Sequence, residues 1–170
     1  MSKQAWVFPG QGSQNLGMLN ELASKYAIIQ ETFSQASEAL GYDLWEVVQN
    51  DEQKLNQTHI TQPALLAASY AIYKLLLEKE YSQPLFLAGH SLGEYSALVC
   101  AGVIGFSDAV KLVEARGQFM QQAVPAGTGA MFAIIGLDDD KVVMSCQQAQ
   151  DETNEVVAAV NFNSPGQIVI

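Results

Sequence analysis

The sequence predicts an α/β fold built on a parallel sheet, followed by a second, smaller unit. Short apolar runs alternate with longer segments in which apolar residues recur at helical spacing. One such run, residues 85–88, continues through Gly89-His90-Ser91-Leu92-Gly93 into a helix-forming stretch, the strand, sharp turn and helix order that exposes a serine at a sheet edge. A Pro/Gly-rich segment at 125–129 then predicts a boundary.

The first unit, residues 1–124, is expected to start with a buried strand at 5–8 that ends at Pro9-Gly10 and leads into a glycine-bearing loop. Residues 16–39 follow with apolar positions at helical spacing. This pattern predicts one broken helix or two successive helices that end at Gly41.

Thr61 is expected to cap the next helix, which carries Pro63 in its first turn. The second strand is expected at 85–88 and a short helix at 93–101. A further helix is then expected from Ser107, as its cap, through Gln122. Alternating strands and helices imply a parallel sheet covered on both faces.

The second unit, residues 125–170, is expected to contain a strand at 130–136, a helix at 138–150 and strands at 156–162 and 167–170. The chain stops inside the last apolar run. Because a domain rarely ends on an exposed, unpaired β-branched segment, we expect the chain to be part of a longer protein.

Composition restricts the classes of function. A chain of 170 residues with 49% hydrophobic and 15% charged residues has enough apolar material for a sizeable core. Its formal charge of −10 opposes nucleic acid and anionic membranes as partners. With no signal segment or membrane span expected, we expect a cytoplasmic protein. Cys100 and Cys146 lack the paired spacing of a metal or redox site, so we expect reduced core thiols and no metal.

Ser91 is the candidate nucleophile, because flanking glycines at 89 and 93 allow a tight turn where side chains would collide with neighbouring backbone. The backbone N–H of Leu92 would supply half of an oxyanion hole. The alternative is a serine that only caps the following helix.

Neither histidine is a convincing base for that serine. His90 is adjacent to Ser91, and the turn should direct its side chain away from the hydroxyl, which leaves it a structural or supporting role. His59 precedes the nucleophile, whereas the histidine follows it in α/β-hydrolase order. A surface or loop role is expected for His59.

A loop after the first strand, Val7-Phe8-Pro9-Gly10-Gln11-Gly12-Ser13-Gln14, is placed to supply the second oxyanion donor. It is not a dinucleotide-binding loop, because Asn15 stands where the third glycine should be. The alternative is a tight glycine turn without a catalytic part.

Arg116 falls within the apolar stripe of the helix that begins at Asp108, so its charge is expected to point toward the core. The stripe consists of Ala109, Leu112, Val113, Phe119, Met120 and Ala123. A buried guanidinium needs an anionic partner. Periodicity leaves two readings open, a structural pair, for instance with Glu94, or a substrate carboxylate.

Together these residues resemble the N-terminal half or slightly more of the malonyl-CoA:acyl carrier protein transacylases, an acyltransferase family of fatty acid and polyketide synthesis. The matching segments are VFPGQGSQ (7–14), TQPALLAAS (61–69), GHSLGEYSAL (89–98), EARGQFMQ (114–121) and NFNSPGQIVI (161–170). The resemblance implies a larger α/β-hydrolase-like subdomain, residues 1–124 here, and a smaller ferredoxin-like subdomain, residues 125–170 here, both incomplete.

The resemblance also implies a mechanism. Ser91 attacks the thioester of malonyl-CoA, the N–H groups of Leu92 and Gln11 hold the oxyanion, and Arg116 pairs with the malonyl carboxylate. The phosphopantetheine thiol of acyl carrier protein then takes the malonyl group. Coenzyme A thioester is a substrate, no bound cofactor is implied, and we expect a monomer at full length.

The resemblance further implies a catalytic histidine beyond Ile170. Since a general base contributes roughly 10²–10⁴-fold, we expect the 170 residues alone to be nearly inactive. Basic docking surface for the two anionic ligands is expected in the same missing part. Asn161, Asn163 and Gln167 either line the site or shape a turn. The competing classes are a serine esterase or thioesterase and a non-catalytic binding module.

Overall fold

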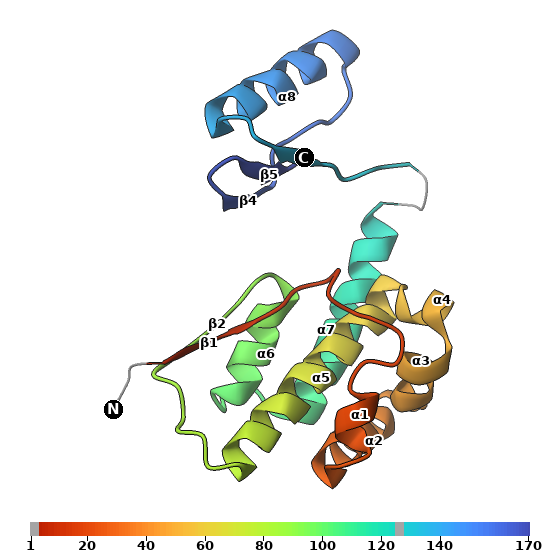
Figure 1. The fold of residues 1–170 in the computed structure, drawn as a ribbon. Coiled ribbons are helices and arrows are strands. Elements are labelled where there is room, and N and C mark those ends of the chain that lie inside the picture. Colours follow the sequence, from red (N-terminus) through yellow and green to blue (C-terminus); the bar gives the residue numbers. More distant parts are fainter. Residues whose placement is uncertain (1–3, 125–127) are drawn as a thin grey trace. The chain divides into compact units, whose positions relative to one another are not determined.

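The computed structural model describes residues 4–124 and 128–170 (Figure 1). The chain forms two compact units, Met1–Ala123 and Val124–Ile170, and each is described by itself. Pro125, Ala126 and Gly127, at the expected boundary, lie outside the described residues.

The first unit contains a pair of strands and a set of helices. In chain order these are β1 (Ala5–Phe8), α1 (Asn20–Ala23), α2 (Ala27–Leu40), α3 (Leu44–Asn50), α4 (Glu52–Leu55), α5 (Thr58–Glu78), β2 (Phe86–Gly89), α6 (Leu92–Cys100) and α7 (Phe106–Ala123). The expected break before α2 is confirmed, and Gly41 ends that helix with φ 80°.

Several helix starts differ from the expectation. The short helices α3 and α4 were not predicted, and each begins at an aspartate, Asp43 or Asp51, whose side chain accepts a hydrogen bond from a first-turn N–H. Helix α5 begins before Thr61, which lies inside it and donates its hydroxyl to the carbonyls of Leu55 and Gln57. Helix α7 begins at Phe106, one residue before the expected cap.

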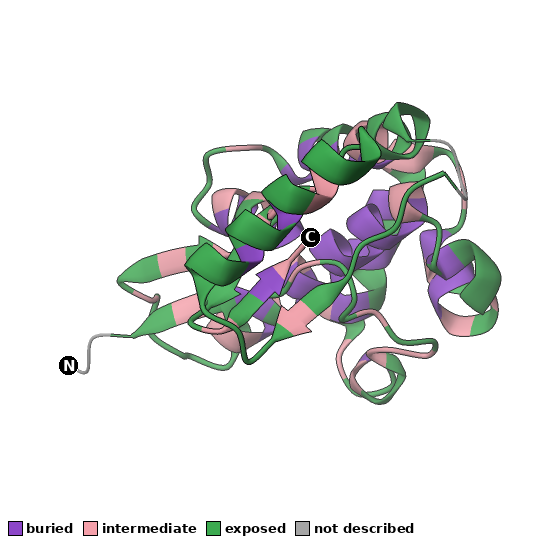
Figure 2. Cartoon of the chain, turned by 90° about the horizontal axis from the view of Figure 1, so that it is seen from above, coloured by how far each residue is buried: buried purple, intermediate pink, exposed green. Residues whose placement is uncertain are grey.

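The parallel pairing of β1 with β2 places Phe8 opposite Gly89 at the carboxyl ends of both strands. Trp6, Phe8 and Leu87 pack on one side, in a cluster with residues of α5 and α6. The other side is open, and both strands are drawn mostly in green and pink in Figure 2. The expectation of two covered faces is therefore wrong for the described residues, because their helices cover one face.

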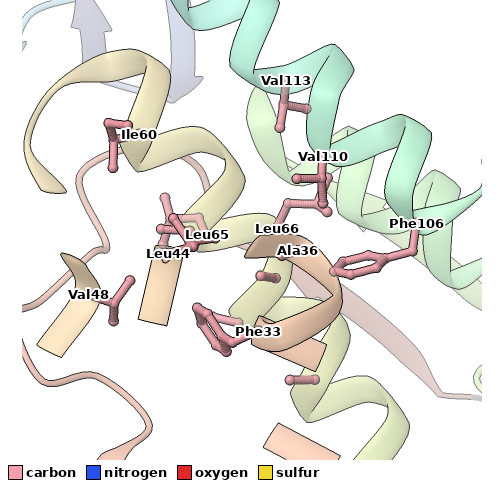
Figure 3. Close-up of a cluster of buried hydrophobic side chains, with 14 of the residues drawn as sticks. Phe33, Ala36, Leu44, Val48, Ile60, Leu65, Leu66, Phe106, Val110 and Val113 are labelled. Atoms are coloured by element: carbon pink, nitrogen blue, oxygen red, sulfur yellow. The ribbon is translucent and has the colours of Figure 1, made fainter. Parts of the chain in front are cut away.

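Helix α5 is the centre of the first unit and packs against α2 and α7. Figure 3 shows Phe33 of α2, Leu66 of α5 and Val110 of α7 meeting in this core, and all three side chains are fully buried. By length and composition α5 could cross a membrane, but 72% of its most apolar window is buried inside the unit. Its neighbours therefore account for its apolar surface.

The buried face of α7 differs from the predicted stripe. It consists of Phe106, Ala109, Val110, Val113 and Gly117. Leu112, Phe119 and Met120 from the predicted stripe are exposed. Apolar side chains on both sides of the helix made the periodicity ambiguous, and the contact with α5 selected one side.

Cys100 and Cys146 are both free and buried, which confirms the expected core thiols. Burial raises the pKa of Cys100 to about 12, so its thiol stays protonated at neutral pH.

The second unit contains β3 (Ala133–Ile135), α8 (Asp139–Thr153), β4 (Asn161–Ser164) and β5 (Gln167–Val169). Its sheet is antiparallel with the order β3-β5-β4, and Ile168 of β5 packs against Val142 and Cys146 of α8. The last apolar run is not an exposed edge within this unit, because β5 lies in the middle of the sheet and pairs on both sides. Asn161, Asn163 and Gln167 lie in strands, and 165–166 form the turn.

The mixed α/β architecture expected from the sequence is confirmed, with a parallel pair in the first unit and a small antiparallel sheet in the second.

The core assignment predicts different costs for two phenylalanine truncations. Phe33→Ala removes a fully buried ring that contacts Trp45 edge to face, and should lower the free energy of unfolding by about 3–5 kcal/mol. Phe119→Ala, at 68% exposure, should change it by less than about 0.5 kcal/mol. Urea denaturation followed by circular dichroism compares the two. Similar losses for both variants would contradict the observed face of α7.

Candidate active site

The turn at Ser91 is a sharp, strained connection between β2 and α6. Ser91 has φ 52° and ψ −107°, a backbone conformation that side chains rarely adopt. A Cβ at Gly89 would overlap the backbone of Gly93, and one at Gly93 would overlap the carbonyl of Phe8. Ser91 makes no side-chain capping bond to α6, so the helix-cap alternative is contradicted. The strained backbone conformation therefore coincides with an exposed serine hydroxyl.

The guanidinium of Arg116 lies beside that hydroxyl. Its Nη2 donates to Ser91 Oγ at 3.1 Å, and its Nη1 donates to Gln62 Oε1 at 2.8 Å. The ring centroid of Tyr95, one turn after Ser91 on α6, lies 5.6 Å from Arg116 Cζ. Three elements, α5, the turn and α6, therefore hold one cation from α7.

Arg116 differs from its expected environment in two ways. It is half-buried at the margin of the packed face of α7, rather than directed into the core. Within residues 4–124 and 128–170, the ion pairs are formed by two lysines and do not include Arg116. The suggested pair with Glu94 is thus contradicted, and the positive charge of Arg116 is not neutralised by a carboxylate of the described chain.

A close approach of two helices places Arg116. A Cβ added to the adjacent Gly117 would lie 2.5 Å from the Cα of His59 at the start of α5. Only a residue without a side chain lets α7 come this near to α5. The approach brings Arg116 of α7 within hydrogen-bond distance of Gln62 on α5.

The loop after β1 lies against the Ser91 turn, because parallel strands end at the same sheet edge. A Cβ at Gly10 would lie 2.7 Å from the carbonyl oxygen of His90. Gln11 follows in this loop and donates from Nε2 to Thr58 Oγ1 at 3.4 Å. Leu92 is the first residue of α6, where a backbone N–H has no acceptor within the helix. The two predicted oxyanion donors thus stand in adjoining segments, and their role stays a prediction.

The histidines lie in different surroundings. His59 is the second residue of α5 and lines a surface pocket with Glu114 and Gln118, which agrees with the surface alternative and not with the loop alternative. Those two residues are each two positions from Arg116, about 200° around α7, and so face away from it. The Nδ1 atom of His90 lies against Gly10, 2.9 Å from where a Cβ would stand.

The site is open rather than enclosed. Ser91 is exposed, and neither it nor Arg116 lines the apolar cavity of about 490 Å³ between β1 and α5. Among the residues that the structure describes, no group of three His, Cys, Asp or Glu side chains could hold a metal ion.

Gln62 and Tyr95 were not identified as site residues from the sequence. A signal existed for Gln62, because it stands inside a run of buried apolar and small residues, and a buried carboxamide needs hydrogen-bond partners. For Tyr95, spacing of four from Ser91 on a helix was the available signal.

A strained, exposed serine between a parallel strand and a helix is the arrangement in which α/β enzymes present a nucleophile, and here a cation lies at its hydroxyl. The chain belongs to the family described as "Acyl transferase domain", whose profile matches residues 5–170.

Proteins with curated names share much of this chain's sequence. The malonyl CoA-acyl carrier protein transacylase of Haemophilus influenzae is 64% identical over 100% of this chain and 54% of its own length. The protein of the same name from Escherichia coli (strain K12) is 59% identical over 100% of the chain and 55% of its own length. The chain thus spans about half the length of the curated relatives it matches.

Solved structures agree with this placement. An acyl carrier protein S-malonyltransferase from Vibrio cholerae superposes with a TM-score of 0.93 at 63% identity, over 99% of this chain and 55% of that one. A malonyl-transacylase in complex with a type II PKS acyl-carrier protein gives a TM-score of 0.95 at 57% identity, over 99% and 54%. The resemblance inferred from the motifs is confirmed.

Substituting Gly117 should separate the two helices that hold Arg116. Gly117→Ala would press a methyl group into the backbone of His59 and should cost about 1–3 kcal/mol of unfolding free energy. Gly105→Ala is the comparison variant, because its nearest neighbour, Asp108 Oδ2, lies at 3.4 Å; it should cost less than Gly117→Ala, about 1 kcal/mol or less, from the change at the start of α7. Chemical denaturation measures both, and equal stability of the two variants would refute the close approach.

Proposed function

We propose that this chain carries the nucleophile and the carboxylate-binding residue of a malonyl-CoA:acyl carrier protein transacylase of fatty acid biosynthesis. The observation that carries the proposal is the Arg116 guanidinium, 3.1 Å from Ser91 Oγ and without a carboxylate partner among the described residues. The names of the relatives support the same substrates.

In the first half of the reaction, Ser91 Oγ attacks the thioester carbonyl carbon of malonyl-CoA. Negative charge develops on the carbonyl oxygen, and the N–H groups of Leu92 and Gln11 stabilise it, helped by the positive end of α6. Collapse breaks the carbon–sulfur bond, the thiol of coenzyme A leaves, and malonyl-Ser91 remains. The phosphopantetheine thiol of acyl carrier protein then attacks the carbonyl carbon of malonyl-Ser91 and forms the new carbon–sulfur bond. The bond from that carbon to Oγ breaks, the proton of the thiol passes to Oγ, and malonyl-acyl carrier protein leaves.

Arg116 supplies the specificity in this proposal. A guanidinium has five N–H donors, and the contacts with Gln62 and Ser91 use two of its nitrogens once each. Further donors stay available for the malonyl carboxylate. Hydrogen bonds to a charged group contribute about 1.5–3 kcal/mol, and an acyl group without a carboxylate would leave the cation unsatisfied.

The proton of Ser91 requires a base, and we assign it to a histidine from outside these 170 residues. The surroundings of His59 support this assignment. It lines a pocket with Glu114 and Gln118, which lie on the opposite side of α7 from Arg116, so we do not assign His59 as the base for Ser91. We further propose a cytoplasmic, monomeric enzyme without nucleic acid or membrane partners, in keeping with the net charge of −10.

The proposal predicts a malonyl adduct on Ser91. Intact-mass spectrometry of the protein that contains this chain, after brief exposure to malonyl-CoA, should detect the adduct in the parent and none in Ser91→Ala. Arg116→Ala should lower the acylation kcat/KM by about 10–100-fold, since it removes a charge-assisted contact.

Two outcomes would support other functions. Rapid release of free malonate without transfer to acyl carrier protein would indicate a thioesterase. Absence of any Ser91 adduct, with a cooperative thermal transition retained, would favour a binding module.

A further inference from the structure

We propose that Gln62 is a positioning residue that determines specificity, because its neutral carboxamide orients Arg116 without cancelling the charge that the substrate carboxylate needs. The inference rests on the proposed function and deepens it. It starts from a fully buried polar side chain on α5 whose Oε1 accepts from Arg116 Nη1 at 2.8 Å.

Because Gln62 is buried, loss of its contact with Arg116 would be energetically costly. Its side chain is 0% exposed and is surrounded on α5 by apolar and small residues. A buried carbonyl that loses its donor pays the full desolvation cost, and so does a guanidinium that loses its acceptor. The pair therefore fixes the direction of the guanidinium before any substrate arrives.

The orientation of the carboxamide is itself determined. Gln62 Nε2 donates to the sulfur of Met120 at 3.3 Å, and Met120 follows Arg116 by one turn of α7. With the NH₂ group on the sulfur, the carbonyl oxygen faces the cation. The reversed amide would place two donors, the NH₂ group and the guanidinium, against each other.

The neutrality of residue 62 is the feature that matters for substrate choice. A carboxylate at this position would hold the guanidinium as firmly, but would pair with its charge inside the protein and weaken its attraction for an incoming carboxylate. The amide of Gln62 orients the guanidinium and leaves its positive charge available to the substrate carboxylate. Ser91 and Tyr95, the other contacts of Arg116, are neutral as well.

Two substitutions test the two parts of this role. Gln62→Glu keeps an acceptor and adds a competing charge, whereas Gln62→Leu removes the acceptor at similar volume. We expect each to lower the ratio of malonyl-CoA to acetyl-CoA acylation of Ser91, measured as kcat/KM by mass spectrometry, by at least about tenfold. In an Arg116→Ala background neither should lower the ratio further, because the residue acts through the arginine.

Thr61→Val is the matched control. Thr61 is the adjacent residue on α5, also fully buried, and its hydroxyl bonds only to the carbonyls of Leu55 and Gln57 among its described hydrogen bonds. It should lower the melting temperature while keeping the malonyl-to-acetyl ratio within about twofold of the parent. A merely structural role for Gln62 would give the same result as this control.

The outcomes separate the two proposals. If the parent forms malonyl-Ser91 but both Gln62 variants keep its ratio, the role of Gln62 is refuted and the proposed function stands. If the additional loss from Gln62→Glu persists without Arg116, the residue does not act through that side chain. If the parent forms no malonyl-Ser91, both proposals fall.

Discussion

The structure depends on a cation that is held at a strained serine by neutral partners. Arg116 sits between Gln62, Ser91 and Tyr95, and each contact comes from a different segment of the first unit. A half-buried guanidinium without a carboxylate is costly, so the surrounding fold must stabilise it. An unneutralised charge at a nucleophile is an arrangement suited to a substrate that brings its own carboxylate.

The fold meets that requirement through close backbone approaches. Gly117 lets α7 lie against the start of α5. Gly89 lets the turn at Ser91 pass close to the backbone of Gly93, and Gly93 lets it pass close to the carbonyl of Phe8. At each of these glycines, neighbouring backbone already fills the space where a Cβ would stand. Since packed interiors tolerate such overlaps poorly, the three positions couple the helix packing to the geometry of the site.

The two units present different environments. The first buries its apolar residues around α5 and leaves one face of the β1–β2 pair open, with Val7 at 74% and Phe86 at 63% exposure. The second encloses Ile168 between its antiparallel sheet and α8. The site residues described above belong to the first unit, and the asparagines of β4 belong to the second.

The sequence by itself determined the main alternation of strands and helices apart from α3 and α4, the sharp turn at Ser91 and the family, because these follow from periodicity, glycine spacing and short motifs. It misjudged the buried face of α7, where Phe119 and Val110 compete on opposite sides, and it left the partner of Arg116 open. Only the tertiary structure decided that Gln62, 54 positions away, faces the guanidinium. Contacts between distant segments depend on how helices cross, and no local pattern encodes the crossing.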